Sequence, residues 1–452
     1  MRQDIPRNWL RYLDGHVPRY TSYPTAVEFD TSVDAQSYER WLTRLPAGAP
    51  ISIYIHIPFC HELCLFCGCH TTVARRYAPI AAYVDLLEHE VSLVARITGH
   101  HQVNHLHWGG GTPTILTATD FLRITASLRA NLAAGPVGQT AVEIDPRSLT
   151  PDYVSVLRDA GVTRVSLGVQ DFDDRVQRSV RRLQSFAQTA RAVDWLRAAG
   201  IASINLDLMY GLPYQTAASV AATTQLALTL RPDRIALFGY AHVPWVKRHQ
   251  KLIPEHALPT SKERFVQNTS AADVIVEAGY QRIGLDHFAM PGDPLARQLC
   301  EGKLHRNFQG YTTDDAPILI GFGASAIGSL PDGYVQNVPS VVGYRERILV
   351  GNLPTLRGRA LTNEDRLRGS IIERLMCELQ VDLAEICAAH GMDADHFAVE
   401  FRKLDNLAED GIVERVRGKI SIPEHARPFV RTVCAVFDAF LPNNEARFSQ
   451  AS

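Results

Sequence analysis

Two adjoining segments, ISIYIHI (51–57) and PFCHELCLFCGC (58–69), decide the fold of this chain. In the first, isoleucines alternate with polar or aromatic residues, which is typical of a strand with one buried face. In the second, four of the chain's eight cysteines lie close together. The two segments together predict a strand whose carboxyl end carries a dense group of thiols.

Beyond the cysteines, strands and helices alternate along the chain. Glycines and capping residues bound the helices, as where Ser185 and Gln188 form a capping-box pattern. Six alternating units predict an α/β fold with a parallel sheet that is closed or partly closed into a TIM-like (β/α)6 barrel. The predicted strands are 51–57, 103–108, 141–145, 164–170, 203–209 and 233–240, and the predicted helices are 79–97, 118–135, 151–161, 185–200 and 216–229.

The length of 452 residues suggests two or three domains. We predict an N-terminal arm over 1–48 and a barrel with an α/β extension over 49–350, which includes a strand at 281–286. Residues 351–452 are predicted to form a mostly helical domain. In it, GIVERVRGKISI (411–422) indicates the hairpin of a winged-helix-like module. The charges of this hairpin are mixed, so DNA binding is not predicted.

Composition excludes several classes of protein. The formal net charge is −2, so no basic excess points to nucleic acid or to an anionic membrane. We find neither a signal peptide nor an apolar run long enough to span a bilayer. A cytoplasmic protein with reduced thiols is therefore expected. Without an obvious dimerisation helix, we expect a monomer.

Three of the predicted strands carry polar side chains on one face. A barrel packed only for stability fills its interior with branched apolar residues. Polar groups near the carboxyl ends of the strands instead predict a polar ligand cavity, against the alternative of a wet interior satisfied by its own hydrogen bonds. These side chains are Glu143 and Asp145, Ser166 and Gln170, and Asn205 and Asp207.

The first three clustered cysteines have C-x3-C-x2-C spacing, which lets one loop present three thiolates to an iron–sulfur cluster. Three protein ligands would leave one iron open to a cofactor. Cys69 could be a fourth ligand of a closed electron-transfer cluster, although it lies only two residues from Cys67. A zinc site would favour two C-x2-C pairs, and only one is present. The glycine run 109–111 follows the next strand, where its amides could bind a carboxylate.

At these residues the chain resembles a known family. C-x3-C-x-F-C followed by GGGTP resembles the radical S-adenosylmethionine (SAM) superfamily. Longer segments resemble the oxygen-independent coproporphyrinogen III dehydrogenases, which are anaerobic enzymes of haem biosynthesis. These segments run in family order and span nearly the whole chain: RYTSYPTA (19–26), YIHIPFCHELCLFCGC (54–69), LHWGGGTPT (106–114), VEIDPR (142–147), GVQDF (168–172), NLDLMYGLP (205–213), LDHFA (285–289) and HRNFQGYTT (305–313).

The resemblance implies one 4Fe–4S cluster held by Cys60, Cys64 and Cys67, two SAM molecules, and a catalytic site that includes Tyr54, Cys69 and Gln309. In this reading Cys69 is not a ligand but lies near the site. The positions that match contacts of the cluster-bound SAM are Tyr54, Gly110, Glu143 and Ile327. Those that match contacts of the second SAM are Phe66, Gly111, Thr112, Gln170, Arg182, Asp207 and Ala241.

The implied reaction is an oxidative decarboxylation. An electron from a reductant such as flavodoxin or ferredoxin passes through the cluster and splits SAM into methionine and a 5'-deoxyadenosyl radical. The radical removes hydrogen from a propionate of coproporphyrinogen III. Loss of CO2 and one electron then leaves a vinyl group, and two such rounds give protoporphyrinogen IX.

Cations or amides would bind the propionates of this substrate, and Arg19, Arg182, Arg306 and Gln309 are candidates. Tyr20, Tyr23 and Tyr311 are expected either to flank the macrocycle or to pack in the core. One departure from the family is Gly239, where an asparagine is usual. Rival functions are a haem chaperone of the superfamily, a haem-opening radical SAM methyltransferase and a ferredoxin-like electron carrier. Cys69 and RYTSYPTA argue against the chaperone, and the barrel argues against the carrier.

Overall fold

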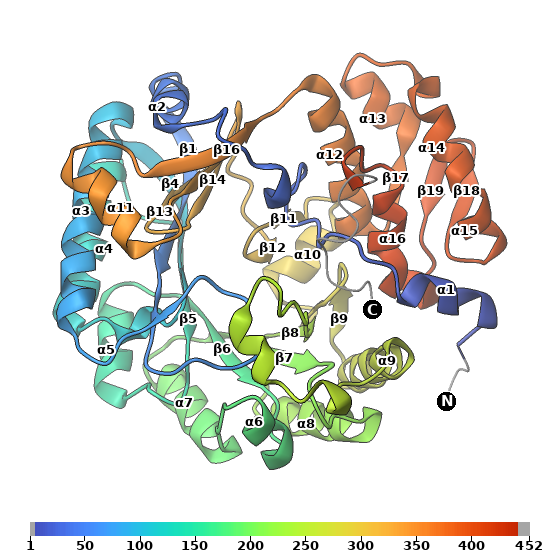
Figure 1. Cartoon of the computed structure of the whole chain (residues 1–452), viewed down its shortest axis with the longest axis horizontal. Helices are drawn as coiled ribbons and strands as arrows, with labels where there is room; N and C mark the ends of the chain where they lie inside the picture. The colour runs from blue at the N-terminus through green and yellow to red at the C-terminus, as the bar shows by residue number, and fades with distance from the viewer. Residues whose placement is uncertain (1–4, 442–452) are drawn as a thin grey trace.

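In the computed structural model, which describes residues 5–441, a curved sheet is surrounded by helices (Figure 1). All six predicted barrel strands are present, and each pairs in parallel with the next. The predicted α/β fold with a partial (β/α)6 barrel is thereby confirmed. The strands are β1 (Gly48–Ile57), β4 (His101–Gly110), β5 (Gln139–Ile144), β6 (Arg164–Gln170), β7 (Ser203–Tyr210) and β8 (Arg234–Gly239).

The helices of these units form an outer layer against the sheet (Figure 1). The apolar side chains of the strands face this layer, as the alternation predicted: Val142, Leu167 and Leu206 are at most 1% exposed. Burying each such side chain stabilises the fold by roughly 1.5–3 kcal/mol. The helices are α3 (Ala78–Thr98), α4 (Ala118–Leu132), α5 (Pro151–Asp159), α6 (Asp174–Ser179), α7 (Phe186–Ala198) and α8 (Ala217–Thr229).

The extension continues the sheet on both sides of the barrel strands. β13 (Ile318–Phe322) pairs in parallel with the outer edge of β1, so Ile51 lies opposite Ile318. Three antiparallel strands, β14, β15 and β16, extend the sheet beyond β13, and two more, β10 and β9, extend it beyond β8. The described sheet therefore ends on two unjoined edges, and the barrel stays open. The further elements are α9 (Ser261–Glu277), β9 (Gln281–Ile283), β10 (His287–Ala289), α10 (Pro294–Cys300), β11 (His305–Asn307), β12 (Gly310–Thr312), β14 (Ile327–Leu330), β15 (Gly333–Asn337), α11 (Val341–Leu349) and β16 (Thr355–Ala360).

The strand predicted at 281–286 is shorter than expected. β9 ends at Ile283, and Gly284 has a φ of +53° that turns the chain back into β10. The Tyr311 ring occupies the space that a side chain at Gly284 would need. The alternation of apolar residues does not mark this turn, whereas the glycine at 284 is the residue type that a positive φ and the nearby ring both require.

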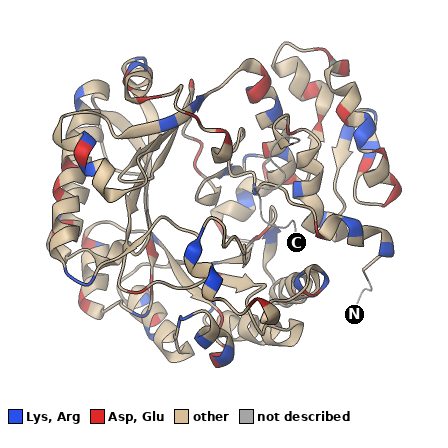
Figure 2. Ribbon diagram, viewed as in Figure 1, with Lys and Arg blue, Asp and Glu red and all other residues tan. Residues whose placement is uncertain are grey.

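The C-terminal part is mostly helical and has its own hydrophobic core. The hairpin predicted within 411–422 is confirmed, and an unpredicted third strand, β17, pairs with it. Charges of both signs are spread over this part (Figure 2). Its elements are α12 (Asn363–Glu378), β17 (Gln380–Asp382), α13 (Leu383–Ala389), α14 (Ala398–Lys403), α15 (Asp405–Glu409), β18 (Glu414–Val416), β19 (Lys419–Ser421) and α16 (Val430–Ala435).

The predicted arm divides between two cores. Its first half, with α1 (Leu10–Leu13), joins the C-terminal core, where the rings of Trp9 and Phe429 lie 5.1 Å apart. Its second half, with α2 (Ala35–Thr43), packs on the barrel. Residues 1–4 of the predicted arm and 442–452 of the predicted C-terminal domain lie outside the described residues.

A buried carboxyl group ties α3 to the turn after β13. Glu90 is 1% exposed. It accepts hydrogen bonds from the backbone of Gly323 (2.7 Å), from Asn337 Nδ2 (2.7 Å) and from the Tyr344 hydroxyl (2.6 Å). Burial raises the pKa of Glu90 to about 7, against an ordinary value of 4.5, although these three donors lower it in part. The network holds the turn that leads into β14.

This pKa makes stability depend on pH. Between pH 4.5 and about 7 the folded state keeps the Glu90 proton, whereas the unfolded chain has released it. The contribution of Glu90 to the free energy of unfolding is therefore complete below pH 4.5 and is lost as the pH rises towards 7. Glu90→Gln removes the titrating group and should therefore abolish the fall of up to about 3 kcal/mol in unfolding free energy that this group gives the wild type between about pH 5 and about pH 8. Chemical denaturation measures the difference, with the exposed Glu39→Gln as control. Parallel pH profiles of Glu90→Gln and the wild type would contradict this account.

Candidate active site

The cysteine loop starts where β1 ends and is held by backbone hydrogen bonds. Cys60 lies in β2 (Phe59–Cys60), which pairs with β3 (Thr72–Val73). The amide of Leu65 donates to the carbonyl of Val180, after α6, and the amide of Cys67 donates to the carbonyl of Cys64. These bonds set the course of the loop independently of any bound group.

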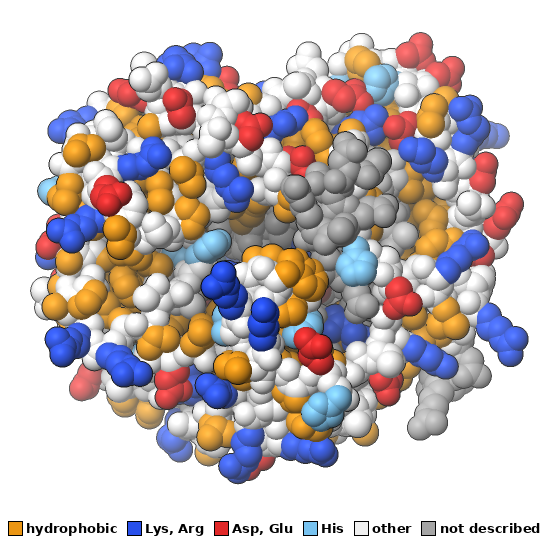
Figure 3. Space-filling view, in the orientation of Figure 1, with side chains coloured by type: hydrophobic (Ala, Val, Ile, Leu, Met, Phe, Trp, Pro, Cys, Tyr) orange, Lys and Arg blue, Asp and Glu red, His pale blue; other side chains and the backbone are white. Residues whose placement is uncertain are grey.

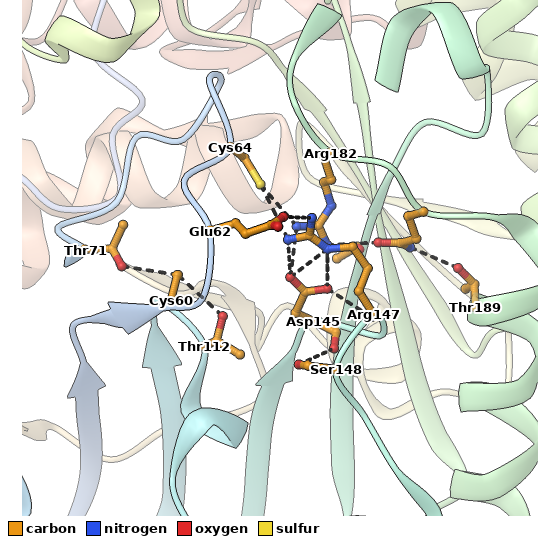
Figure 4. Close-up of polar contacts among 12 residues, drawn as sticks. Cys60, Glu62, Cys64, Thr71, Thr112, Asp145, Arg147, Ser148, Arg182 and Thr189 are labelled. Carbon is orange, nitrogen blue, oxygen red and sulfur yellow. Dashed lines mark hydrogen bonds and ion pairs between the residues drawn. The ribbon is translucent and has the colours of Figure 1, made fainter. Parts of the chain in front are cut away.

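Two of the predicted ligand sulfurs accept hydrogen bonds (Figure 4). The hydroxyls of Thr71 and Thr112 lie 3.2 and 3.4 Å from Cys60 Sγ. The guanidinium of Arg182 lies 3.5 Å from Cys64 Sγ. Donors and cations of this kind stabilise thiolates and tune the potential of a cluster bound by them. The surroundings therefore fit thiolate ligands of an iron–sulfur cluster.

The separation of the clustered thiols helps to distinguish a site for a single metal ion from a site for an iron–sulfur cluster. Within residues 5–441, no three His, Cys, Asp or Glu side chains converge closely enough to hold a single metal ion. A cubane requires a wider arrangement, because each of its three thiolates binds a different iron atom. All eight cysteines are free thiols.

Cys69 differs from the other three clustered cysteines by facing the main cavity. Its hydrogen bond with Cys67 lowers the pKa of Cys67. Cys69 lines the cavity, whereas Cys60, Cys64 and Cys67 are not among the residues that line it. This orientation exposes its thiol to the cavity.

The cavity has a volume of about 820 Å³ and collects predicted residues from distant parts of the chain. Its wall also includes Thr21 from the arm and Trp245 from the loop after β8. Figure 3 shows hydrophobic and basic side chains gathered over this loop, where Trp245 is 58% exposed. The cavity is lined by all three predicted catalytic residues and all four predicted contacts of the first SAM: Tyr54, Cys69, Gly110, Glu143, Gln309 and Ile327.

Glu143 is positioned by two neighbours on β4. Its Oε2 accepts from the amide of Gly110 at 3.3 Å, and its Oε1 lies 3.2 Å from Nε2 of His107. The ring of His107 also stacks near Tyr54, with centroids 5.9 Å apart. Sequence reasoning missed His107, although the alternation of His105 and His107 with apolar residues marks a polar face on this strand as well.

The predicted polar interior is present around Asp207. Its carboxylate accepts from Ser166 Oγ at 2.9 Å and from Asn205 Nδ2 at 2.7 Å. Burial in the interior of the barrel raises the pKa of Asp207 to about 7, although the hydrogen bonds from these two donors lower it in part. The interior is not satisfied by its own groups: among the described residues, Gln170 Oε1 and Asn205 Oδ1 are buried without a hydrogen-bond partner. Such orphaned atoms fit a polar ligand.

Arg182 connects this interior to the cysteine loop. It lies 3.3 Å from Asp145, and it donates to the carbonyl of Gly168 at 2.6 Å. Arg147 also pairs with Asp145, at 2.6 Å. Burial alone would raise the pKa of Asp145, but the two arginines lower it overall. Of the other residues predicted to contact the second SAM, the carbonyls of Phe66 and Ala241 both accept from Gln250.

The loop after β8 also fastens the cysteine loop, and the sequence offered no signal for this contact. Nε2 of His249 lies 2.8 Å from the carbonyl of Cys67. Nζ of Lys247 donates to the carbonyl of Cys69 at 3.0 Å. With Gln250, these bonds make the loop a clamp over residues 66–69.

The candidate propionate-binding arginines differ in their present partners. Arg306 is buried over the Tyr311 ring and lies 3.8 Å from Asp286. Arg19 reaches the carbonyl of Gly239 at 3.1 Å. At Gly239, the position of the missing asparagine, a side chain would collide with the hydroxyl of Tyr210. That space is therefore already occupied.

The three tyrosines named as possible macrocycle neighbours are packed and bonded. Tyr20 and Tyr23 are at most 5% exposed. The Tyr20 hydroxyl donates to Asp438, and the Tyr23 hydroxyl accepts from the amide of Ala439. The Tyr311 hydroxyl donates to the carbonyl of Met376. These contacts support a packing role, which joins the arm and the extension to the C-terminal part.

The different orientations of the cysteines lead to a test by iron content. Cys64→Ser should lose most of the iron after anaerobic reconstitution, because a ligand is removed. Cys69→Ser should keep the wild-type iron content, because its side chain faces the cavity. Iron and acid-labile sulfide analysis measures both, with the buried Cys387→Ser as control. Equal iron loss in Cys64→Ser and Cys69→Ser would rule out the three-ligand assignment.

Comparison with known proteins places this site in a family. The Radical SAM superfamily profile matches residues 54–227. The chain is 49% identical to the oxygen-independent coproporphyrinogen III oxidase of Bradyrhizobium diazoefficiens, over 100% of both chains. It is 42% identical to that of Paracoccus denitrificans, over 97% of this chain and 98% of the relative.

A solved structure agrees with these relatives. Coproporphyrinogen III oxidase (HemN) from Escherichia coli, described as a radical SAM enzyme, superimposes with a TM-score of 0.90 at 38% identity. The match covers 98% of this chain and 100% of that chain. The chain therefore belongs to the oxygen-independent coproporphyrinogen III oxidases of the radical SAM superfamily.

Proposed function

We propose that this protein catalyses the oxygen-independent oxidative decarboxylation of two propionates of coproporphyrinogen III to vinyl groups, which gives protoporphyrinogen IX for haem biosynthesis. The observation that carries the proposal is the cavity of about 820 Å³, because it joins Cys69, Glu143 and Gln309 from three distant segments. Two relatives that are named for this activity match the chain over at least 97% of its length.

Membership of the superfamily implies a 4Fe–4S cluster and SAM. We propose that Cys60, Cys64 and Cys67 hold the cluster, since two of their sulfurs already accept hydrogen bonds. When bound, the cluster and SAM supply the one-electron chemistry that removes hydrogen from an unactivated carbon. The part of the protein is to orient the reactants and to exclude water from the cavity.

Within the cavity, the side chains divide into two proposed groups. Glu143, held by Gly110 and His107, presents a carboxylate to the amino group or ribose of SAM, with Tyr54 beside it. Gln309 carries amide donors that suit a propionate carboxylate. The Cys69 thiol faces the cavity and can hold a proton near the reacting carbon.

The second SAM is a further proposal. Phe66, Gly111, Thr112 and Ala241 offer backbone and side-chain contacts around the polar interior of Gln170, Arg182 and Asp207. The orphaned atoms Gln170 Oε1 and Arg182 Nε support a polar occupant there, because a buried unpaired polar atom costs about 1–3 kcal/mol.

We also propose that the protein works as a cytoplasmic monomer in three parts, the arm (1–48), the barrel with its extension (49–350) and the C-terminal domain (351–452). A reductant such as flavodoxin or ferredoxin would supply the electrons. No described helix is long and apolar enough to cross a membrane.

The second site is tested by stoichiometry. Asp207→Ala should lower the number of SAM molecules bound per chain from two to one, because it removes the carboxylate at the centre of the interior network. Equilibrium dialysis of the reconstituted protein measures this number. The exposed Asp194→Ala, on α7, serves as control and should bind as the wild type does. A wild-type stoichiometry of one would contradict the proposal.

The reaction is tested by its products. Reconstituted protein given SAM, dithionite and coproporphyrinogen III without oxygen should yield protoporphyrinogen IX and two CO2 per substrate, detected by mass spectrometry. Gln309→Leu should raise KM more than it lowers kcat, because leucine is similar in size to glutamine but lacks the amide that would bind a propionate. Stable haem binding with no loss of CO2 would instead indicate the chaperone function.

A further inference from the structure

A second hollow, of about 950 Å³, lies against the other end of the cysteine loop. Residues 60–63 line this hollow, which we call the Cys60 groove, whereas residues 68–70 line the main cavity. The two hollows have no lining residue in common. The cysteine loop therefore lies between the main cavity and this groove.

The Cys60 groove touches the groups that hold the sulfurs. Cys60 itself lines it, together with Thr112, whose hydroxyl bonds to Cys60 Sγ. Arg147, which lies 3.8 Å from Cys64 Sγ, also belongs to its wall. A molecule seated in the groove would thus lie against the cluster ligands without entering the cavity. Electrons could pass there while the radical chemistry stays shielded from water.

The groove carries an excess of positive charge. Its wall contains four arginines, namely Arg75, Arg147, Arg178 and Arg181, and two carboxylates, Glu62 and Asp145. Both carboxylates are paired with Arg147, at 3.3 and 2.6 Å. Arg75 and Arg181 are exposed and form no ion pair with any residue of the described range 5–441. The charges left for a partner are therefore cationic.

Apolar side chains also line the groove. Leu183 is 56% exposed and Val73 is 39% exposed, and both line the groove beside Leu63. Apolar and charged side chains together are typical of a protein-docking surface, and small interfaces suit brief electron-transfer encounters.

We infer that the Cys60 groove docks a small acidic one-electron carrier protein, of the flavin or iron–sulfur class, which reduces the cluster. This inference rests on the proposed function, because that reaction consumes one electron for each SAM cleaved. In the docked complex one electron leaves the carrier and enters the cluster, and no atom or proton is transferred. Complementary charge steers the encounter and makes its rate depend on salt.

The test reverses two groove charges in the reconstituted holoenzyme. Arg75→Glu with Arg181→Glu should lower the second-order rate constant for cluster reduction by a reduced acidic flavodoxin at least about tenfold at about 50 mM salt. The salt dependence of this rate should flatten. Reduction by dithionite should stay within about twofold of the wild type, because a small reductant needs no docking surface. Anaerobic stopped-flow absorbance of the cluster measures both rates.

The matched control carries the same charge change elsewhere. Arg402→Glu with Lys403→Glu alters two exposed residues on α14, in the C-terminal part (Figure 1), and should leave both rates unchanged. If the double groove variant binds less iron, the single variant Arg75→Glu replaces it, with an expected loss of about threefold.

Three results would overturn the inference. They are a wild-type rate and salt dependence with flavodoxin, an equal loss with dithionite, and inhibition of the flavodoxin reaction by inorganic phosphate at matched ionic strength, which would indicate a small-anion site. Cluster reduction is measured without substrate. A protein that is reduced through the groove but forms no vinyl product would therefore contradict the proposed function and leave the docking surface standing.

Discussion

The register between β1 and β4 is the constraint on which the site depends. Ile57, the last residue of β1, lies opposite Gly110, and the amide of Gly111 donates to the carbonyl of Ile57 at 2.8 Å. A side chain at Gly111 would collide with the carbonyl of Phe59. This close approach brings the glycine run against the cysteine loop, so that Thr112 reaches Cys60 Sγ. The proposed cluster ligand Cys60 and the proposed SAM contacts Gly110, Gly111 and Thr112 meet at this junction.

The interior of the barrel gives up stability for function. Carboxyl and amide groups occupy positions that apolar side chains would fill in a barrel built only for stability. The raised pKa of Asp207 and the unpartnered Gln170 Oε1 are physical signs of that cost. A bound polar ligand would offset it, since ligand binding stabilises the folded state that it selects. Such local departures from good packing are expected at functional sites.

Long-range contacts complete the cavity and the groove. The loop after β8 bonds to the backbone of Cys67 and Cys69, and thereby fixes the side of the cysteine loop that faces the reactants. The opposite side faces the Cys60 groove. In the arrangement that we propose, one short loop separates the surface for electron entry from the cavity for hydrogen abstraction.

The sequence by itself determined the features that repeat locally. Period-two alternation and capping residues located the six barrel strands and five of the helices that accompany them, but not the short α6. The spacing of Cys60, Cys64 and Cys67 predicts the cluster ligands. Of the polar positions 143, 170 and 207, Glu143 lines the cavity, whereas the other two lie in the polar interior of the barrel. Only the tertiary structure decided the pairing of β13 with β1, the sharing of a core between the arm and α16, and the clamp of Lys247 on Cys69. These contacts join residues far apart in the chain, 178 positions in the last case, and no local period records them.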